Sequence, residues 1–367
     1  MRLTPDQDER DLAAMCRSLL AAHRCDATHV EPALWHALAE AGVLGLGITE
    51  EFGGSGGTLT DLGIFCIEAG RALCPSAVHS TLHAGLAVDW IGGPDARAAW
   101  LPALTSGAAR AATALWNPRD ASMPGSSVRC AGDGAGRWRL SGVADFVADA
   151  AAADLIVLAA ESDSGCCVFV VEPARTGITV APLPMAGEHR ACAVTFDDVL
   201  LDDDAPVLAT SVGPEALRRV ANAATALLSL DLVGVGEAVV QRTVDHIMMR
   251  EQFGRPIASF QAAQHLVANM RIALSAARLA AQWAVYRVGQ GHVGTRETAI
   301  ARMHAAAVKQ ITLDAHQLHG GMGYVVDTDL HLFSERARVL STWGGGADVA
   351  AKWLEDEMDW KGNGQSD

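Results

Sequence analysis

The spacing of hydrophobic residues changes twice along the chain, and this change constrains the fold more than any other feature. In the first third, apolar residues recur three to four positions apart, as Leu12 and Met15 do, which is the spacing of one helix face. The middle third carries short β-branched runs punctuated by glycine and proline, typical of an antiparallel barrel or sandwich. The helical spacing then returns, as at Leu266 and Met270. The order predicts an α+β fold with three domains: helical 1–112, β-barrel 113–208 and helical 209–367.

Charge and hydropathy exclude several classes of function. The net charge of -15 argues against binding to nucleic acid or to anionic lipid. The longest apolar runs, 150–160 and 220–230, are shorter than the roughly 20 residues that cross a bilayer, so we expect no membrane span. The N-terminus is acidic and contains Pro5 where an export signal would be apolar. We therefore expect a cytoplasmic protein.

The cysteines and histidines do not predict a metal site. The eight cysteines form no CxxC pair, and buried thiols are the expected state in a chain of this kind. His316, His319 and His331 lie close together in the sequence, but no carboxylate or cysteine completes a ligand set at zinc spacing. The sequence predicts no metal.

Four motifs together resemble the acyl-CoA dehydrogenase family over essentially the whole chain. The first motif, residues 34–56, leads into a Gly-Gly loop, and the second is Glu68-Ala-Gly-Arg. The third, residues 250–261, begins Arg-Glu-Gln-Phe-Gly-Arg, and the fourth, residues 317–324, reads Gln-Leu-His-Gly-Gly-Met-Gly-Tyr. The resemblance implies an N-terminal helical domain, a middle antiparallel β-domain and a C-terminal four-helix bundle. It also implies an FAD enzyme that removes two hydrogens from the Cα–Cβ bond of an acyl-CoA thioester.

That chemistry needs a carboxylate base on the face of the substrate opposite the flavin. Family members usually carry a glutamate directly before Gly-Thr in the last helical stretch, and Gly344 stands at that place here. A minority supply the base from an earlier helix, where this chain has Ala224, followed by Thr225. By resemblance, neither base position carries an ionisable group, so the expected set of catalytic residues is empty.

Further departures from the family pattern fall around the flavin ring. Trp116 replaces the threonine of the segment that cradles the ring. The strand beside flavin N5 reads Phe146-Val-Ala148 and has lost its hydroxyl, and the Gly-Thr pair has become Gly345-Gly346. Asp348, Glu237, Glu251 and Glu335 are the remaining candidate carboxylates. Asp348 is about 6 Å of helical rise from the lost base, and the glutamates are expected on solvated helix surfaces.

Residues that family members donate across a dimer interface to a neighbour's FAD are retained. Arg250 would meet the pyrophosphate, Phe253 would pack on the cofactor, and Gln317 with Gly320 and Gly321 would offer polar and backbone groups near the ADP portion. A plainer alternative is that Arg250 caps a helix and that the glycines only break one.

The combination resembles the short, non-catalytic subunit of heteromeric (α2β2) actinobacterial acyl-CoA dehydrogenases. Its partner would be a longer homologous subunit that carries the glutamate. The two subunits would share FAD, and their substrate would be a fatty or steroid side-chain acyl-CoA. Two other hypotheses stay open. One is a homo-oligomer with a non-oxidative or differently catalysed reaction, and the other is a scaffolding pseudoenzyme.

Overall fold

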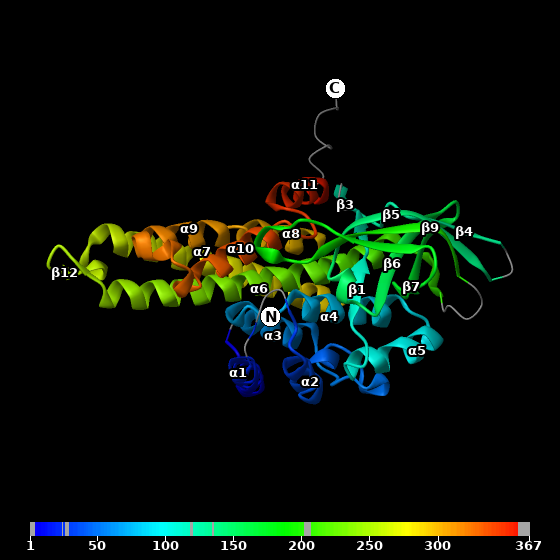
Figure 1. Ribbon diagram of the computed structural model, residues 1–367, viewed down its shortest axis with the longest axis horizontal. Coiled ribbons are helices and arrows are strands. Elements are labelled where there is room, and N and C mark those ends of the chain that lie inside the picture. The colour runs from blue at the N-terminus through cyan, green and yellow to red at the C-terminus, as the bar shows by residue number, and fades with distance from the viewer. Residues whose placement is uncertain are drawn as a thin grey trace, which may run out of the picture.

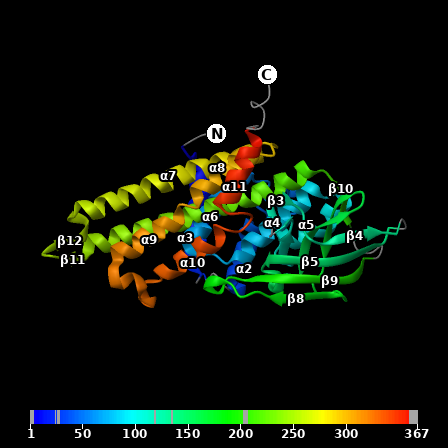
Figure 2. The same ribbon diagram turned by 90° about the horizontal axis from the view of Figure 1, so that it is seen from above.

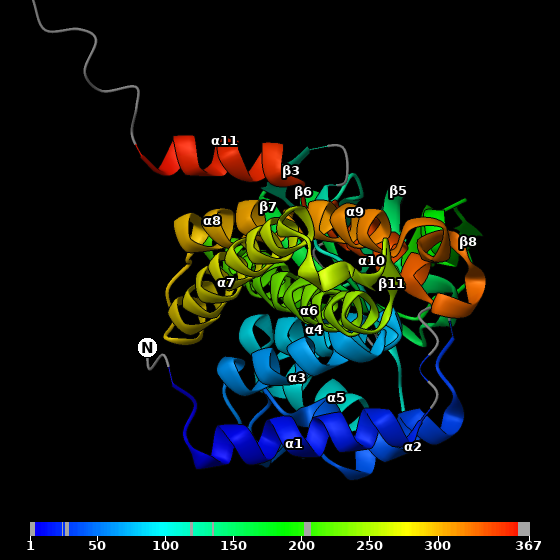
Figure 3. The same cartoon turned by 90° about the vertical axis from the view of Figure 1, so that its left-hand side faces the viewer.

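The computed structural model describes residues 4–23, 25, 29–117, 120–133, 136–201 and 207–358. The chain is elongated, with the β-sheet at one end and the β11–β12 hairpin at the other (Figures 1 and 2). The end view shows the N-terminal helices as a layer against one side of the C-terminal helices (Figure 3). The helical, β and helical order that the sequence predicted is therefore confirmed.

The N-terminal part is helical, as its apolar spacing predicted. Its helices are α1 (Gln7–Ala22), α2 (Pro32–Glu40), α3 (Leu59–Ala72), α4 (Ser76–Ile91) and α5 (Pro94–Thr105). Two helices begin with capping boxes, in which a side chain at the N-cap and one three residues later each accept a backbone N–H. Asp6 and Glu9 form the box of α1, and Thr58 and Asp61 form that of α3.

The middle strands form one mostly antiparallel sheet, in the order β10-β7-β6-β4-β5-β9-β8, with β1 paired to β6. The strands of this sheet are β1 (Ala111–Ala114), β4 (Arg129–Gly132), β5 (Trp138–Ala148), β6 (Leu155–Ser162), β7 (Gly165–Val171), β8 (Ile178–Pro182), β9 (Ala191–Leu201) and β10 (Val207–Val212). A short hairpin, β2 (Trp116–Asn117) with β3 (Asp120–Pro124), lies beside it.

Two features of the sheet differ from the sequence-based expectation. The pairs β1–β6 and β4–β6 are parallel, because long connections rather than tight hairpins join these strands. Among the described residues the path of pairings ends at β10 and β8 and does not close into a barrel. The strands also run from Ala111 to Val212, a little beyond the expected 113–208 at both ends.

The C-terminal part is built around α6, which lies inside the fold for most of its length. Its helices are α6 (Pro214–Met249), α7 (Gln261–Gly289), α8 (Thr295–Ala305), α9 (Val308–His319), α10 (Leu330–Leu340) and α11 (Ala347–Glu357). The hairpin β11 (Glu251–Gln252) with β12 (Arg255–Pro256) joins α6 to α7. Helix α6 is long and apolar enough to cross a membrane, but 94% of its most apolar window is buried inside the structure.

A buried ion pair joins α6 to α10 and α4. Arg336 donates two hydrogen bonds to Asp231, at 2.9 and 2.6 Å, and both side chains are fully buried. Nε2 of His79 lies 2.8 Å from the same carboxylate. Burial acts to raise the pKa of Asp231, but the Arg336 guanidinium holds that pKa well below its ordinary value.

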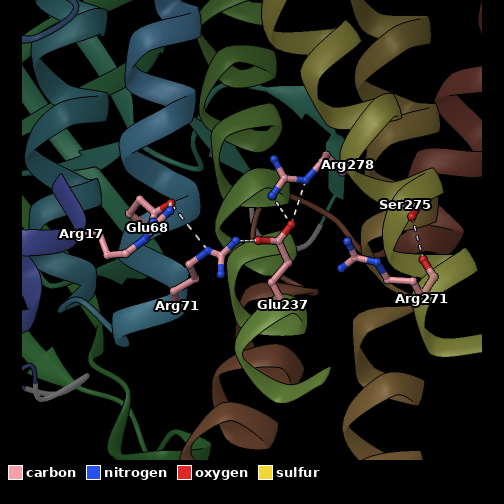
Figure 4. Close-up of polar contacts among 7 residues, drawn as sticks. All are labelled: Arg17, Glu68, Arg71, Glu237, Arg271, Ser275 and Arg278. Carbon is pink, nitrogen blue, oxygen red and sulfur yellow. Dashed lines mark hydrogen bonds and ion pairs between the residues drawn. The ribbon is translucent and has the colours of Figure 1, made fainter. Parts of the chain in front are cut away.

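A second charged network ties the N-terminal helices to the bundle (Figure 4). Glu237 on α6 is buried between Arg71 of α3 and Arg278 of α7. Glu68 accepts two hydrogen bonds from Arg17 of α1, at 3.0 and 2.8 Å. The expectation that Glu237 lies on a solvated helix surface is wrong, because three helices meet at this carboxylate and two arginines replace its water.

Replacing Arg336 with methionine should lower the free energy of unfolding by about 3–5 kcal/mol, because Asp231 would remain buried without its cation. Arg139→Met is the matched control, since Arg139 pairs with Asp198 at the surface and such pairs contribute about 0–1 kcal/mol. Urea unfolding followed by circular dichroism measures both values. Equal losses in the two variants would contradict a structural role for the buried pair.

Candidate functional site

A cavity of about 480 Å³ lies where the three parts of the chain meet. Helix α4 contributes His79, Ser80 and His83, and the 342–346 loop forms the facing wall. The remaining lining residues come from the β-domain, α6 and α11: Thr113, Trp116, Phe146, Ala148, Met185, Leu228, Asp348, Val349 and Lys352. The departures from the family pattern at Trp116, Phe146, Ala148 and Gly344–Gly346 are thus brought together around one space.

Gly344 and Thr225 meet at the wall of this cavity. A Cβ atom added at Gly344 would lie 3.0 Å from Oγ1 of Thr225 and 4.0 Å from Cζ2 of Trp116. Gly344 has a φ of +68°, a left-handed conformation that is strained for residues with a side chain. Ala224 is buried and directly precedes Thr225 on α6. Gly344 and Ala224, which the sequence analysis assigned to the two base positions, therefore lie in one region of the fold.

Arg302 on α8 holds the glycine loop in place from behind. This fully buried guanidinium donates hydrogen bonds to the carbonyl oxygens of Leu340, Trp343 and Gly345. Burial lowers the pKa of Arg302 to about 10, which leaves it charged at neutral pH. Arg302 was not predictable as a site residue from the sequence, because no local pattern distinguishes an arginine that binds main-chain carbonyls from one that faces solvent.

The floor of the cavity on α4 is polar. Burial lowers the pKa of His83 to about 3, so this ring is uncharged at neutral pH, and its Nε2 has no hydrogen-bond partner among the described residues. Ser80 donates a hydrogen bond of 2.9 Å to Asp149, which also accepts one of 3.0 Å from Ser76. Burial nevertheless raises the pKa of the Asp149 carboxyl to about 6. The sequence analysis did not single out these α4 residues, because their partners are distant in the sequence.

The five residues predicted to touch a neighbour's cofactor gather at the far end of the bundle, which we call the tip. Arg250 is the C-cap of α6 and is exposed, and Phe253 in the following hairpin is 93% exposed. Gln317 is exposed in the last turn of α9, and Gly320 and Gly321 follow it with no atom within 4 Å of an added Cβ.

A stacked histidine pair joins the end of α6 to the end of α9 at the tip. His246, in the last turn of α6, stacks on His319 at the end of α9 with ring centroids 4.3 Å apart. Around this pair the tip exposes several large apolar side chains: Met248, Met249, Met322, Tyr324 and Val326. An apolar surface of this kind is typical of a site where another protein binds.

The tip and the cavity are separate sites within one chain. Thr225 at the cavity and Arg250 at the tip lie on the same continuous helix, about 37 Å apart at 1.5 Å per residue. The β-sheet and the β11–β12 hairpin accordingly stand at opposite ends of the molecule (Figure 2). Arg250 therefore has no access to the cavity of its own chain.

The other candidate carboxylates have different surroundings. Asp348 lines the cavity from the first turn of α11, and its Oδ1 lies 2.6 Å from where a Cβ of Gly346 would stand. Glu251 is exposed in the hairpin at the tip, far from the cavity. The described residues contain no group of three or more histidine, cysteine, aspartate or glutamate side chains placed to hold a metal ion.

Comparison with known proteins identifies the family. Residues 7–108 match the acyl-CoA dehydrogenase N-terminal domain, and residues 213–358 match the acyl-CoA dehydrogenase C-terminal domain. The fold matches solved members of the same family over almost the whole chain. The chain belongs to the acyl-CoA dehydrogenase family.

Several relatives resemble the chain over most of their length. The acryloyl-CoA reductase (NADH) of Anaerotignum propionicum is 27% identical, over 89% of this chain and 87% of that protein. The ChsE4–ChsE5 complex of Mycobacterium tuberculosis contains a chain that is 25% identical with a TM-score of 0.88, covering 98% of this chain and 99% of that one. A variant of the steroid acyl-CoA dehydrogenase Tcur3481–Tcur3483 is 27% identical with a TM-score of 0.86, covering 96% and 98%.

Proteins of this fold bind FAD. One of them is a glutaryl-CoA dehydrogenase of Mycobacterium smegmatis, solved in complex with FADH2. It is 21% identical to this chain with a TM-score of 0.88, covering 97% of this chain and 95% of that one. The cavity of the present chain does not suit the flavin ring. Trp116 and Phe146 place aromatic rings there, Ala148 has no hydroxyl, and Gly344 has no base. At the tip the Arg250 side chain is exposed, and a Cβ added at Gly320 or Gly321 would meet no described atom within 4 Å.

Replacing Gly344 with alanine should lower the free energy of unfolding by about 1–2 kcal/mol, because the left-handed backbone disfavours any Cβ. Gly85→Ala is the matched control inside α4, where the added methyl would meet only Ile48 at 3.7 Å. Gly344→Glu should be at least as destabilised as Gly344→Ala. Thermal and urea unfolding of the three variants measure the effect, and an unchanged Gly344→Ala would contradict the strained conformation.

Asp149 should make the chain less stable as pH rises from about 4 to about 6. The unfolded carboxyl loses its proton near pH 4, whereas the folded carboxyl retains it to about pH 6. The folded state binds more protons across this window, so the free energy of unfolding falls by on the order of 3 kcal/mol. Urea titrations at several pH values should show this slope in the native chain and a flatter one in Asp149→Asn. The same slope in both would assign it to another group.

Proposed function

We propose that this chain is the non-catalytic subunit of a heteromeric, FAD-dependent acyl-CoA dehydrogenase. The observation that carries the proposal is the separation of about 37 Å between a cavity without a base and a tip whose cofactor-facing residues are retained. A tip that has no access to its own cavity acts on a second chain. The catalytic glutamate and the flavin ring then belong to a longer homologous partner.

In this arrangement the chain's own residues bind and orient one end of the partner's cofactor. The exposed Arg250 guanidinium would form charge-assisted hydrogen bonds to the pyrophosphate, and Phe253 would pack against the cofactor. Gln317 would offer its side-chain amide. The Gly320 N–H already donates to the carbonyl of Gln317, and the open space where a Cβ would stand at Gly320 and Gly321 would let the cofactor approach the backbone closely. When bound, FAD supplies the hydride acceptor of the dehydrogenation.

The surroundings of the tip support a protein partner. Met248, Met249 and Tyr324 are 62%, 80% and 79% exposed, and burial of these side chains would stabilise a complex by about 25 cal/mol per Å² of apolar surface. The heteromeric complexes among the solved relatives, ChsE4–ChsE5 and Tcur3481–Tcur3483, favour a heterotetramer. The second of these is a steroid enzyme, which favours a steroid side-chain acyl-CoA over a fatty acyl-CoA and a role in cytoplasmic lipid breakdown.

The test is to purify the chain alone and together with the longer homologue, and to measure flavin absorbance per subunit and mass in solution. One FAD per pair of unlike chains, with the chain alone colourless, supports the proposal. A yellow homo-oligomer with one FAD per chain would reject it. That result would favour the second candidate, a homo-oligomer with its own chemistry, for which Asp348 in the cavity is the remaining carboxylate.

Arg250→Gln should weaken FAD retention by the complex about 10–100-fold, because a charge-assisted contact contributes about 1.5–3 kcal/mol. Arg242→Gln is the matched control on the same helix, since the Arg242 guanidinium lies over the ring of Phe333, 5.0 Å from its centroid. Equilibrium dialysis against FAD measures the retention. Equal effects of both substitutions would indicate general damage to the tip.

A further inference from the structure

The cavity in this chain has a buried positive charge behind one wall. The Arg302 side chain is 0% exposed to solvent. Among the described residues it has no carboxylate partner. Its hydrogen bonds go to the carbonyl oxygens of Leu340, Trp343 and Gly345, and within the described part of the chain its Nη1 has no hydrogen-bond partner. Carbonyl dipoles satisfy part of the guanidinium but do not neutralise it, and in a low-dielectric interior the remaining charge attracts an anion.

Two further positive features lie on the same side of the cavity. Lys352 lines the rim from α11 and is exposed. The first turn of α11, at Gly346 to Val349, also lines the cavity, and the N-terminus of a helix carries a partial positive charge. Asp348 is the one carboxylate that lines the described cavity, and it opposes these groups from the exposed rim.

The rest of the lining combines three aromatic residues with small, apolar and polar ones. Trp116, Phe146 and Trp343 line the cavity, although aromatic residues make up only 5% of the sequence. His83 on the opposite side is buried, and its Nε2 has no partner. The charge of the cavity is therefore concentrated at the 342–346 loop and α11, and its body is suited to an apolar group.

We propose that the cavity binds a small carboxylic acid as its anion, with the carboxylate against the 342–346 loop and α11 and an aromatic or aliphatic body among Trp116, Phe146 and Trp343. The carboxylate would occupy the space left by the absent side chain of residue 344, beside the hydroxyl of Thr225. The binding is non-covalent and involves no chemical step. It concerns the chain's own cavity and does not depend on a partner or on FAD.

The test compares two probes of the same shape and different charge, 3-phenylpropanoate and 3-phenylpropanamide, on the isolated chain. Tryptophan fluorescence and isothermal titration calorimetry should give an affinity for the carboxylate at least tenfold higher than for the amide. Lys352→Gln should reduce that ratio about threefold, and Asp348→Asn should raise it about threefold, as expected for exposed charges. Both residues are exposed, so neither substitution should impair folding.

Lys309→Gln is the matched control, because Lys309 is an exposed lysine on α9 that does not line the cavity. It should leave both affinities unchanged. Equal binding of the acid and the amide, no binding of either, or a preference for the acid that neither Lys352→Gln nor Asp348→Asn alters would overturn the proposal. The proposed subunit role is tested separately by flavin content in the heteromer, so each idea can fail without the other.

Discussion

The burial of α6 is the constraint on which the rest of the structure depends. A 36-residue helix is about 54 Å long, and nearly every turn of this one faces another element. Its interior polar residues are therefore paired: Asp231 with Arg336, and Glu237 with Arg71 and Arg278. These pairs fix how the N-terminal helices and α10 pack against α6, because a charge inside a helical bundle tolerates little displacement from its partner.

The same helix sets the distance between the two functional regions. Thr225 lies beside the cavity, and Arg250 ends the helix at the tip. Since a helix neither stretches nor folds back, changes at one end leave the geometry of the other unaltered. The cavity and the exposed apolar tip are therefore held apart by one rigid element. This independence is the physical basis on which a divided role between two chains becomes possible.

Much of the fold was predictable from the sequence, and the candidate site was predictable in part. The change in hydrophobic spacing gave the helical, β and helical order, and the motif at Arg250 located the tip. Gly344, Trp116 and Phe146 were expected around one space, and the structure brings them there. The parallel pairing of β1 with β6 was not predictable, because strand pairing depends on contacts distant in the sequence. For the same reason Arg302 was missed and Glu237 was wrongly expected at the surface.

The conformation of Gly344 also bears on how the chain can evolve. The loop adopts a left-handed backbone that glycine alone accepts readily, and Arg302 holds the loop there through its carbonyl groups. Thr225 and Trp116 border the space that a side chain would need. A single codon change to glutamate therefore restores neither the position nor the direction of a carboxylate, so several coordinated changes would be required.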